Sequence, residues 1–209
     1  MYRPPAFRED RIDVMHALIR NHPLATLVTA AGGLDANLVP FTIASDRGDK
    51  GVLRAHMAKG NDQLGMLRRG QEAMVIFQGP EHYITPSWYA SKAEHGEVLP
   101  TWNYVVVLVW GTPQVIDDFE WLRVQTDELT KKQERTRAEP WNVTDAPETF
   151  VTSQLRGIVG LEIPISRIEG KWKVSQNRSE HDRRTVVSGL RAEGRSAAMA
   201  EIVAERLRQ

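Results

Sequence analysis

VLPTWNYVVV, residues 98–107, is the stretch that decides the fold of this chain. It passes from a proline through an indole, an amide and a phenol into an unbroken run of valine. β-Branched and aromatic residues favour a strand, and a run that is apolar at every position suits a strand covered on both faces. Trp102, Asn103 and Tyr104 stand where this strand emerges, and each joins a flat or planar body to a hydrogen-bonding tip. We therefore expect a buried strand whose polar-aromatic end suits the edge of a flat ligand.

The composition limits the class of protein. The 209 residues fit one large domain, or one domain with an elaborated terminus. The 27 basic and 27 acidic residues balance, so the whole-chain charge gives no sign of a duplex-binding surface. Cysteine is absent, which excludes disulfides and Cys-ligated metals, and the histidines lack the spacing of a metal site. The N-terminal residues lack the apolar core of a signal peptide, and no apolar stretch is long enough to cross a bilayer. We expect a cytoplasmic protein.

The order of predicted elements favours a mainly β protein with peripheral helices, in the α+β class. A helix that begins after Asp10 ends at His22-Pro23, because the residue before proline leaves the α region. Strands are expected over residues 24–30, 34–44, 52–57, 73–78, 105–116, 157–168 and 172–175. Helices are expected after Asn61, which caps the first of them, and over 118–135, 150–155, 180–190 and 196–207. A β-meander with inserted helices suits an antiparallel barrel better than a βαβ sheet.

A cationic segment lies where the third predicted strand runs into the short helix. Alternation places Arg54 and His56 on one face of the strand, and Lys59 and Asn61 follow at the helix entrance. Cations that converge on free helix N–H groups make a plausible phosphate site. The competing interpretation is an ordinary strand-to-helix turn with surface charge, and the residues alone favour it. No glycine-rich nucleotide-binding fingerprint is present.

A donor-rich segment follows near the end of the chain. The residues that could bond a phosphate, a ribityl chain or the edge of a flavin ring are Lys171, Lys173, Ser175, Gln176, Asn177 and Arg178. A polar turn before the next helix explains the same residues equally well.

Four separated motifs, together with the opening MYRPPAF, closely resemble the PaiB family of FMN-binding negative transcriptional regulators. The motifs are HMAKGN at residues 56–61, FQGP followed by YITPSWY at 77–89, PTWNY at 100–104, and GKWK followed by SQNR at 170–178. The resemblance covers residues 1–190, which we take as an FMN-binding split-barrel domain. Residues 191–209 are less typical and are taken as a C-terminal helical tail.

The resemblance implies an antiparallel split β-barrel, related to pyridoxamine-phosphate-oxidase-like proteins, that binds FMN at a two-fold interface of a homodimer. Carried over by position, Arg54, His56 and Lys59 stand on the phosphate side, with Asn61 beside them. Residues Asn37 to Pro40 line the isoalloxazine. Trp102 and the segment from Lys173 through Ser175 to Gln176 approach from the partner subunit or cover the ring. The abundance of large aromatics near strand ends also favours a dimer.

The function that the resemblance implies is a flavin-binding negative transcriptional regulator. The alternative is a flavin-dependent oxidoreductase related to flavin reductases or pyridoxamine phosphate oxidase, and no general acid or base stands out to decide whether the protein is an enzyme. A structural dimer whose flavin site has decayed is a third hypothesis. The closing helices carry Arg183, Arg184, Arg191 and Arg195 among acidic residues, so we expect DNA binding to be weak or indirect.

Overall fold

The computed structural model describes residues 1–30 and 32–208, which form two compact units. The first unit comprises Met1–Met15, Gln78–Val107 and the chain from Glu169 onward, and the second comprises His16–Phe77 and Leu108–Ile168. Three strands have residues in both units: β6 (Ala73–Ile84), β7 (Thr101–Gly111) and β10 (Arg167–Lys173). The chain therefore passes between the units within these three strands and within the helix α1 (Ile12–Asn21), rather than through separate linkers.

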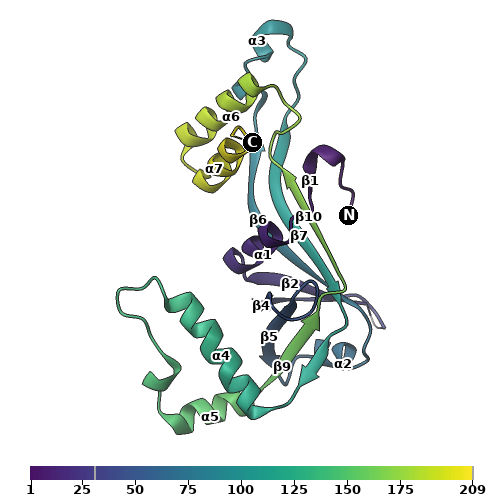
Figure 1. The fold of residues 1–209 in the computed structure, drawn as a ribbon, viewed down its shortest axis with the longest axis vertical. Helices are drawn as coiled ribbons and strands as arrows, with labels where there is room; N and C mark the ends of the chain where they lie inside the picture. Colours follow the sequence, from purple (N-terminus) through teal and green to yellow (C-terminus); the bar gives the residue numbers. More distant parts are fainter. Residues whose placement is uncertain (31, 209) are drawn as a thin grey trace. The chain divides into compact units, whose positions relative to one another are not determined.

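The first unit is a sheet with helices. Its strands follow the order β1-β10-β7-β6, where β1 is Arg8–Glu9 and pairs antiparallel with β10 (Figure 1). The short turn η1 (Pro5–Phe7) precedes β1, whereas η2 (Pro86–Trp88) and α3 (Lys92–His95) lie between β6 and β7; α1 (Ile12–Asn21) also begins here. The chain closes with α6 (Glu180–Glu193) and α7 (Ala197–Glu205), which pack on each other, and Leu190 of α6 and Met199 of α7 are fully buried.

The second unit contains two antiparallel sheets and most of the helical insertions. In one sheet, β2 (Leu24–Thr29) pairs with β3 (Asp35–Pro40) and with the start of β6. The other has the order β4-β5-β9-β8, made of β4 (Thr42–Ala44), β5 (Val52–Ala58), β9 (Ile158–Pro164) and β8 (Gln114–Ile116). The helices are α2 (Gln63–Leu67), α4 (Phe119–Glu134), η3 (Val143–Asp145) and α5 (Glu148–Arg156). Phe41 and Phe77 meet edge to face in the core, with ring centroids 5.9 Å apart.

Several sequence predictions need correction. The expected strand over residues 34–44 is two strands interrupted at Phe41, and that over 105–116 is β7 and β8, interrupted by Thr112-Pro113. Proline has no N–H for a strand ladder, which accounts for the second break. Trp102, Asn103 and Tyr104 lie within β7 rather than before it. The strand is not covered on both faces, because its alternate residues Val105, Val107 and Val109 are buried while those between them are only half-buried.

Local sequence signals mark the ends of α4 and α6. The side chain of Asp118 accepts a hydrogen bond from the backbone N–H of Trp121 at 2.7 Å, so it caps α4. Ser179 caps α6 in the same way, and the helix ends at Gly194, whose φ of 71° lies in the left-handed region. Helix α6 continues across residue 190 to Glu193. The division into a domain of residues 1–190 and a tail of residues 191–209 stays a prediction. Residue 209 lies outside the described residues.

Candidate functional site

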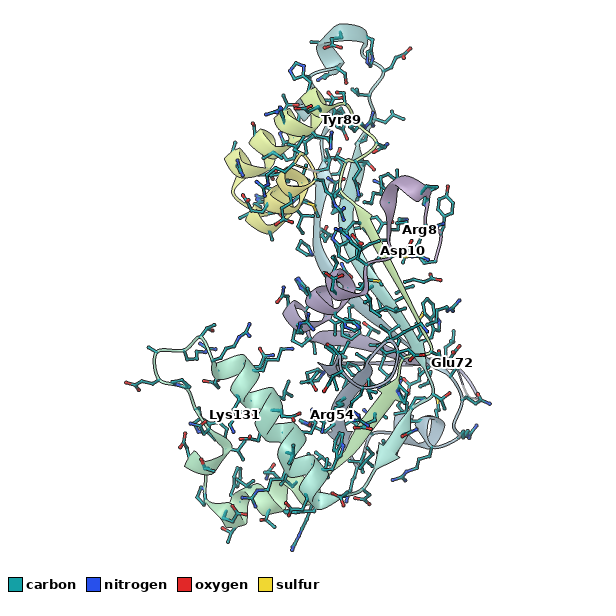
Figure 2. All side chains as sticks on the ribbon, in the orientation of Figure 1. Arg8, Asp10, Arg54, Glu72, Tyr89 and Lys131 are labelled. Atoms are coloured by element: carbon teal, nitrogen blue, oxygen red, sulfur yellow. The ribbon has the colours of Figure 1, made fainter. Side chains whose placement is uncertain are left out.

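Arg54 and His56 lie on one face of β5, as the alternation predicts, but their neighbours differ from those expected. Nη1 of Arg54 donates to Oε2 of Glu128 at 2.5 Å, and its Nε lies 3.4 Å from Oε1 of Glu162. The guanidinium carbon also lies 4.9 Å from the ring centroid of Trp121. Figure 2 shows Arg54 beside α4 in the second unit. Two carboxylates therefore already compensate the charge of this arginine.

Glu162, on β9, is a central residue of this face that sequence reasoning missed. Its carboxylate is buried and accepts hydrogen bonds from Arg47 at 2.5 and 3.0 Å and from the indole N–H of Trp121 at 3.2 Å. The hydrogen bonds from Arg47 lower the pKa of Glu162 although burial raises it. Gly160 opposes His56 in the ladder, and a Cβ there would lie 2.3 Å from the Trp121 ring, so glycine allows the indole to approach β9.

His56 is held by a buried amide rather than by a cluster of cations. Its Nδ1 lies 2.7 Å from Oε1 of Gln125 on α4, and because an amide oxygen only accepts, Nδ1 is the donor of this hydrogen bond. His56 also lines a cavity of about 280 Å³ whose other walls come from α4, α5 and the preceding loop. These walls include Trp141, Phe150 and Leu155. The environment of His56 is thus mostly apolar.

Lys59 and Asn61 follow β5 as predicted. Nζ of Lys59 lies 3.1 Å from Oδ1 of Asp117, and the lysine side chain is 43% exposed. Oδ1 of Asn61 accepts the backbone N–H of Gln63 at 2.9 Å, so its side chain satisfies a free donor at the start of α2. Asn61 thus performs the capping predicted for it, although the formal N-cap position is Asp62. Of the predicted phosphate residues, Lys59 has the most exposed cation.

Asn37 and Pro40 occupy β3 but lie on opposite faces of it, because residues three apart in a strand point to opposite sides. The side chain of Asn37 donates to Oε1 of Gln63 at 3.1 Å. Gln63 is fully buried, and its amide donates in turn to the carbonyl of Leu27 at 3.0 Å. The structure therefore brings Asn37 and Asn61 together through Gln63, whereas Pro40 faces away with the exposed Leu38.

The predicted residues of the first unit include an exposed aromatic group. Trp102 is 54% exposed, and its ring centroid lies 5.8 Å from that of Tyr83 in an edge-to-face arrangement. Both rings line a cavity of about 470 Å³. His82 stacks on Trp88 in the same cavity, with centroids 6.0 Å apart and planes 8° apart. Flat aromatic walls with polar edges suit a planar ligand.

Lys171 and Lys173 lie on one face of β10 in the first unit. Nζ of Lys173 donates to Oγ1 of Thr101 and to the carbonyl of Trp102, each at 2.5 Å. Lys171 is only 8% exposed, and its ammonium faces the rings of Tyr2 and Tyr104. Within residues 1–30 and 32–208, neither lysine makes an ion pair with a carboxylate. Burial first, and then the charges of Lys171 and Arg178, lower the pKa of Lys173.

Ser175 and Gln176 use their polar atoms within the turn after β10. The hydroxyl of Ser175 exchanges hydrogen bonds with the amide of Asn103 at 2.9 and 3.3 Å, and both residues are buried. Gln176 accepts from the N–H of Val174 and donates to the carbonyl of Trp172. Ser175 has a φ of 67°, which a non-glycine residue adopts only when its surroundings enforce it. These two residues hold the turn that follows Lys173.

The fold is a split β-barrel of the α+β class, built from antiparallel sheets with several helices. Residues 1–167 match the family described as "Putative FMN-binding domain", and the chain belongs to that family. It is 34% identical to an uncharacterized protein of Emericella nidulans over 99% of this chain and 97% of the relative. It is 30% identical to the protease synthase and sporulation protein PAI 2 of Bacillus subtilis over 100% of this chain and 99% of the relative.

Solved structures agree on the fold. The FAD and heme binding protein from Mycobacterium smegmatis aligns with a TM-score of 0.58 and 20% identity over 79% of this chain and 73% of that one. The flavocytochrome Anf3 from Azotobacter vinelandii aligns with a TM-score of 0.57 and 13% identity over 79% of this chain and 69% of that one. FMN, the predicted cofactor, is thus the cofactor of the family to which the chain belongs. None of the described helices has the length and apolar character needed to span a membrane.

The residues present fit FMN in chemical terms. The cofactor needs cations for its phosphate, hydrogen-bond partners for the polar ring edge and flat surfaces for the ring. On the first unit, Lys171 and Lys173 offer positive charge that no described carboxylate neutralises, and Trp102 offers an exposed ring. On the second unit, Lys59 is the accessible cation, whereas Arg54 is compensated by Glu128 and Glu162.

Proposed function

We propose that this chain is an FMN-binding regulatory protein of the PaiB type that influences transcription without itself reading DNA. One observation supports the claim that the protein does not itself read DNA. The arginines of helix α6 already bind carboxylates or a backbone carbonyl in the same part of the chain. Arg184 pairs with Glu180 at 2.6 Å, and Arg191 pairs with Glu201 at 2.8 Å. Nη1 of Arg183 donates to the carbonyl of Arg206 at 3.1 Å. A DNA-reading surface needs several free Lys or Arg side chains for phosphates. The proposed place of action is the cytoplasm.

The proposed flavin residues are those predicted from the sequence. They are Asn37, Pro40, Arg54, His56, Lys59 and Asn61 on the second unit, and Trp102, Lys173, Ser175 and Gln176 on the first. The exposure of Trp102 and Lys59 and the unpaired charge of Lys173 support direct contacts for these three. Ser175, Gln176 and Asn37 use their polar atoms in hydrogen bonds within the protein, which supports a role in positioning the residues that contact the flavin. Bound FMN would supply electron transfer, with the protein contributing orientation and electrostatics.

An electrophoretic mobility shift against the upstream region of the protein's own gene tests the proposal. With FMN bound and at physiological salt, we expect no sequence-selective shift by the protein alone, because neutralised arginines release few counterions from the phosphates. A tight, selective shift that disappears in Arg183→Ala/Arg184→Ala would contradict indirect action. Absorbance of the purified protein near the flavin bands tests the cofactor part separately.

A flavin-dependent oxidoreductase is the second candidate, and the two lysines on β10 favour it, of which Lys171 is buried and Lys173 half-buried. Positive charge without a carboxylate partner beside aromatic rings suits a cofactor that gains negative charge on reduction. The test is steady-state oxidation of NADH and NADPH by the FMN-loaded protein, followed by flavin absorbance. Turnover that Lys173→Met lowers would favour the enzyme, whereas reduction without turnover would favour the regulator.

The proposal includes a homodimer, which an exposed apolar face supports. Leu24 on β2 and Leu38 on β3 are 57% and 67% exposed, and the register puts both on the same face of this hairpin. Large contiguous apolar patches on soluble proteins commonly mark interfaces. Light scattering at micromolar concentration should give twice the chain mass, and Leu38→Glu should lower that mass. A monomer mass for the native chain would refute the dimer.

A further inference from the structure

A cavity of about 430 Å³ in the second unit is lined by more cationic than anionic side chains. Its walls come from the end of α1, from β4 and β5, and from α4. The residues that line it are Arg20, Thr42, Ile43, Ala44, Asp46, Arg54, Glu128, Lys132 and Arg135. In Figure 2, Arg54 marks the β5 wall and Lys131 marks the α4 residue that precedes Lys132. Four cations and two carboxylates thus share one cavity.

The carboxylates leave three of these cations uncompensated. Glu128 is bonded to Arg54, and Asp46 lies exposed at the rim. Arg20 donates to the hydroxyl of Ser45 at 3.0 Å, which is a neutral partner. Among the described residues, none of Arg20, Lys132 and Arg135 makes an ion pair with a carboxylate. All three line the same cavity, and burial first, and then the charges of Arg20 and Arg135, lower the pKa of Lys132.

We propose that this cavity binds the dianionic phosphoryl group of a small molecule. Like charges that face one space destabilise the empty site and are relieved by an anion placed between them. The planar guanidinium groups of Arg20 and Arg135 match the bidentate geometry of phosphate, and Lys132 adds a point charge at half-buried depth. The volume exceeds that of a phosphoryl group alone, and Ile43 and Ala44 offer apolar surface for the body that carries it.

The inference goes beyond the proposed function, because it rests on residues of α1 and α4 that the flavin prediction did not include. Two molecules could supply the same chemistry: FMN through its own phosphate, or a separate phosphorylated metabolite. In the first case the phosphate of FMN lies here instead of at Lys59. In the second case the protein has an anionic ligand besides its flavin. The arms of one experiment separate these sources.

Calorimetric titration of inorganic phosphate into the full chain, at constant ionic strength and pH 7.5, tests the site. We expect binding that weakens at least tenfold in Lys132→Gln and in Arg135→Gln. Lys131→Gln is the matched control, because Lys131 precedes Lys132 on α4 but pairs with Asp127 at 2.7 Å. Absence of binding, or equal affinity in all four proteins, overturns the proposal.

Thermal melts show whether each variant is folded, so that a loss of binding is not mistaken for a loss of structure. Since Lys132→Gln removes repulsion, its melting temperature without ligand should equal or exceed that of the native chain. Phosphate should raise the melting temperature of the native chain and of Lys131→Gln, but not that of Lys132→Gln. A phosphate-induced rise of equal size in Lys132→Gln would overturn the proposal.

FMN and riboflavin identify the source. If FMN displaces phosphate and riboflavin does not, and Lys132→Gln weakens only FMN, the flavin supplies the phosphoryl group. If the FMN-saturated protein still binds phosphate with unchanged affinity, a separate phosphorylated ligand does. Failure of both flavins to bind, with phosphate binding intact, would refute the proposed function and leave this site standing.

Discussion

Two groups of cations, one on each unit, include residues that the sequence assigned to the flavin, and the groups differ in how their charge is balanced. Arg54 on β5 is held between Glu128 and Glu162, and His56 is bonded to a buried amide. Lys171 and Lys173 on β10 have aromatic rings, a hydroxyl and a carbonyl as neighbours, with no carboxylate pair among the described residues. A cation that the fold already neutralises contributes mainly to stability. One that it leaves unpaired is available to an anionic ligand.

The largest effect should come from breaking the balanced side. Glu162→Gln removes the carboxylate that faces Arg47 and Arg54, and we expect the free energy of unfolding to fall by about 3 kcal/mol, as for other buried pairs that lose one partner. Urea denaturation followed by tryptophan fluorescence measures this. Glu128→Gln is the control, because the Glu128 side chain is 49% exposed, and its loss should cost less than about 1 kcal/mol. Equal losses would show that burial does not distinguish the two pairs.

The acid stability of the first unit tests whether it too contains a balanced site. Glu9 is buried and bonds Arg11 and Arg206, and these bonds outweigh the opposing effect of burial and lower its pKa from 4.5 to about 2. Because the folded-state pKa is lowered, the stabilisation is present above pH 4.5 and is lost as the pH falls from 4.5 towards 2. The shift corresponds to roughly 3 kcal/mol.

Urea denaturation at several pH values between 2 and 6 checks the prediction for Glu9. The slope of stability against pH in this range should become shallower in Glu9→Gln. Asp10→Asn is the control, since that side chain is 64% exposed. A slope that Asp10→Asn reduces as much as Glu9→Gln would assign the acid lability elsewhere. If the slope depends on Glu9, the first unit balances Arg11 and Arg206 with a buried carboxylate, in contrast to the lysines of β10.

The sequence predicted where residues stand on their strands and helices better than it predicted their long-range partners. Alternation correctly placed Arg54 and His56 on one face, and Asp118 correctly marked the start of α4. No local pattern could reveal that Glu128 and Glu162 neutralise Arg54, because those residues are distant along the chain and meet it only through strand pairing and helix packing. The sequence also did not predict that the Ser175 side chain is buried. Ser175 has a left-handed backbone and bonds the buried amide of Asn103, which is 72 residues away along the chain.

The unbalanced side should respond in ligand affinity rather than in stability. Lys173→Met should weaken FMN by roughly 1–3 kcal/mol, the usual range for a lost charge-assisted bond, while unfolding changes little. The lysine is partly desolvated and repelled by Lys171 and Arg178, so its removal relieves a cost in the empty protein. Fluorescence quenching on titration with FMN measures the affinity. Lys92→Met, on α3, provides the control, and an affinity equal to that of the native chain would remove Lys173 from the flavin site.

The smallest effect concerns Lys59, which stands between the two classes because it is both exposed and paired. If Lys59 binds the phosphate of FMN, as predicted, Asp117 competes for the same ammonium at 3.1 Å. Asp117→Asn should then strengthen the binding of FMN by roughly 0.5 kcal/mol, the scale of an exposed ion pair, and Lys59→Ala should weaken that binding.

Glu120→Gln is the control. It removes an acid from the first turn of α4 and should leave the affinity for FMN unchanged. Calorimetry with FMN and with riboflavin decides, because only the phosphate-bearing ligand should respond. If Asp117→Asn and Lys59→Ala both leave FMN affinity unchanged, Lys59 belongs with Arg54 among the cations that the fold has already balanced.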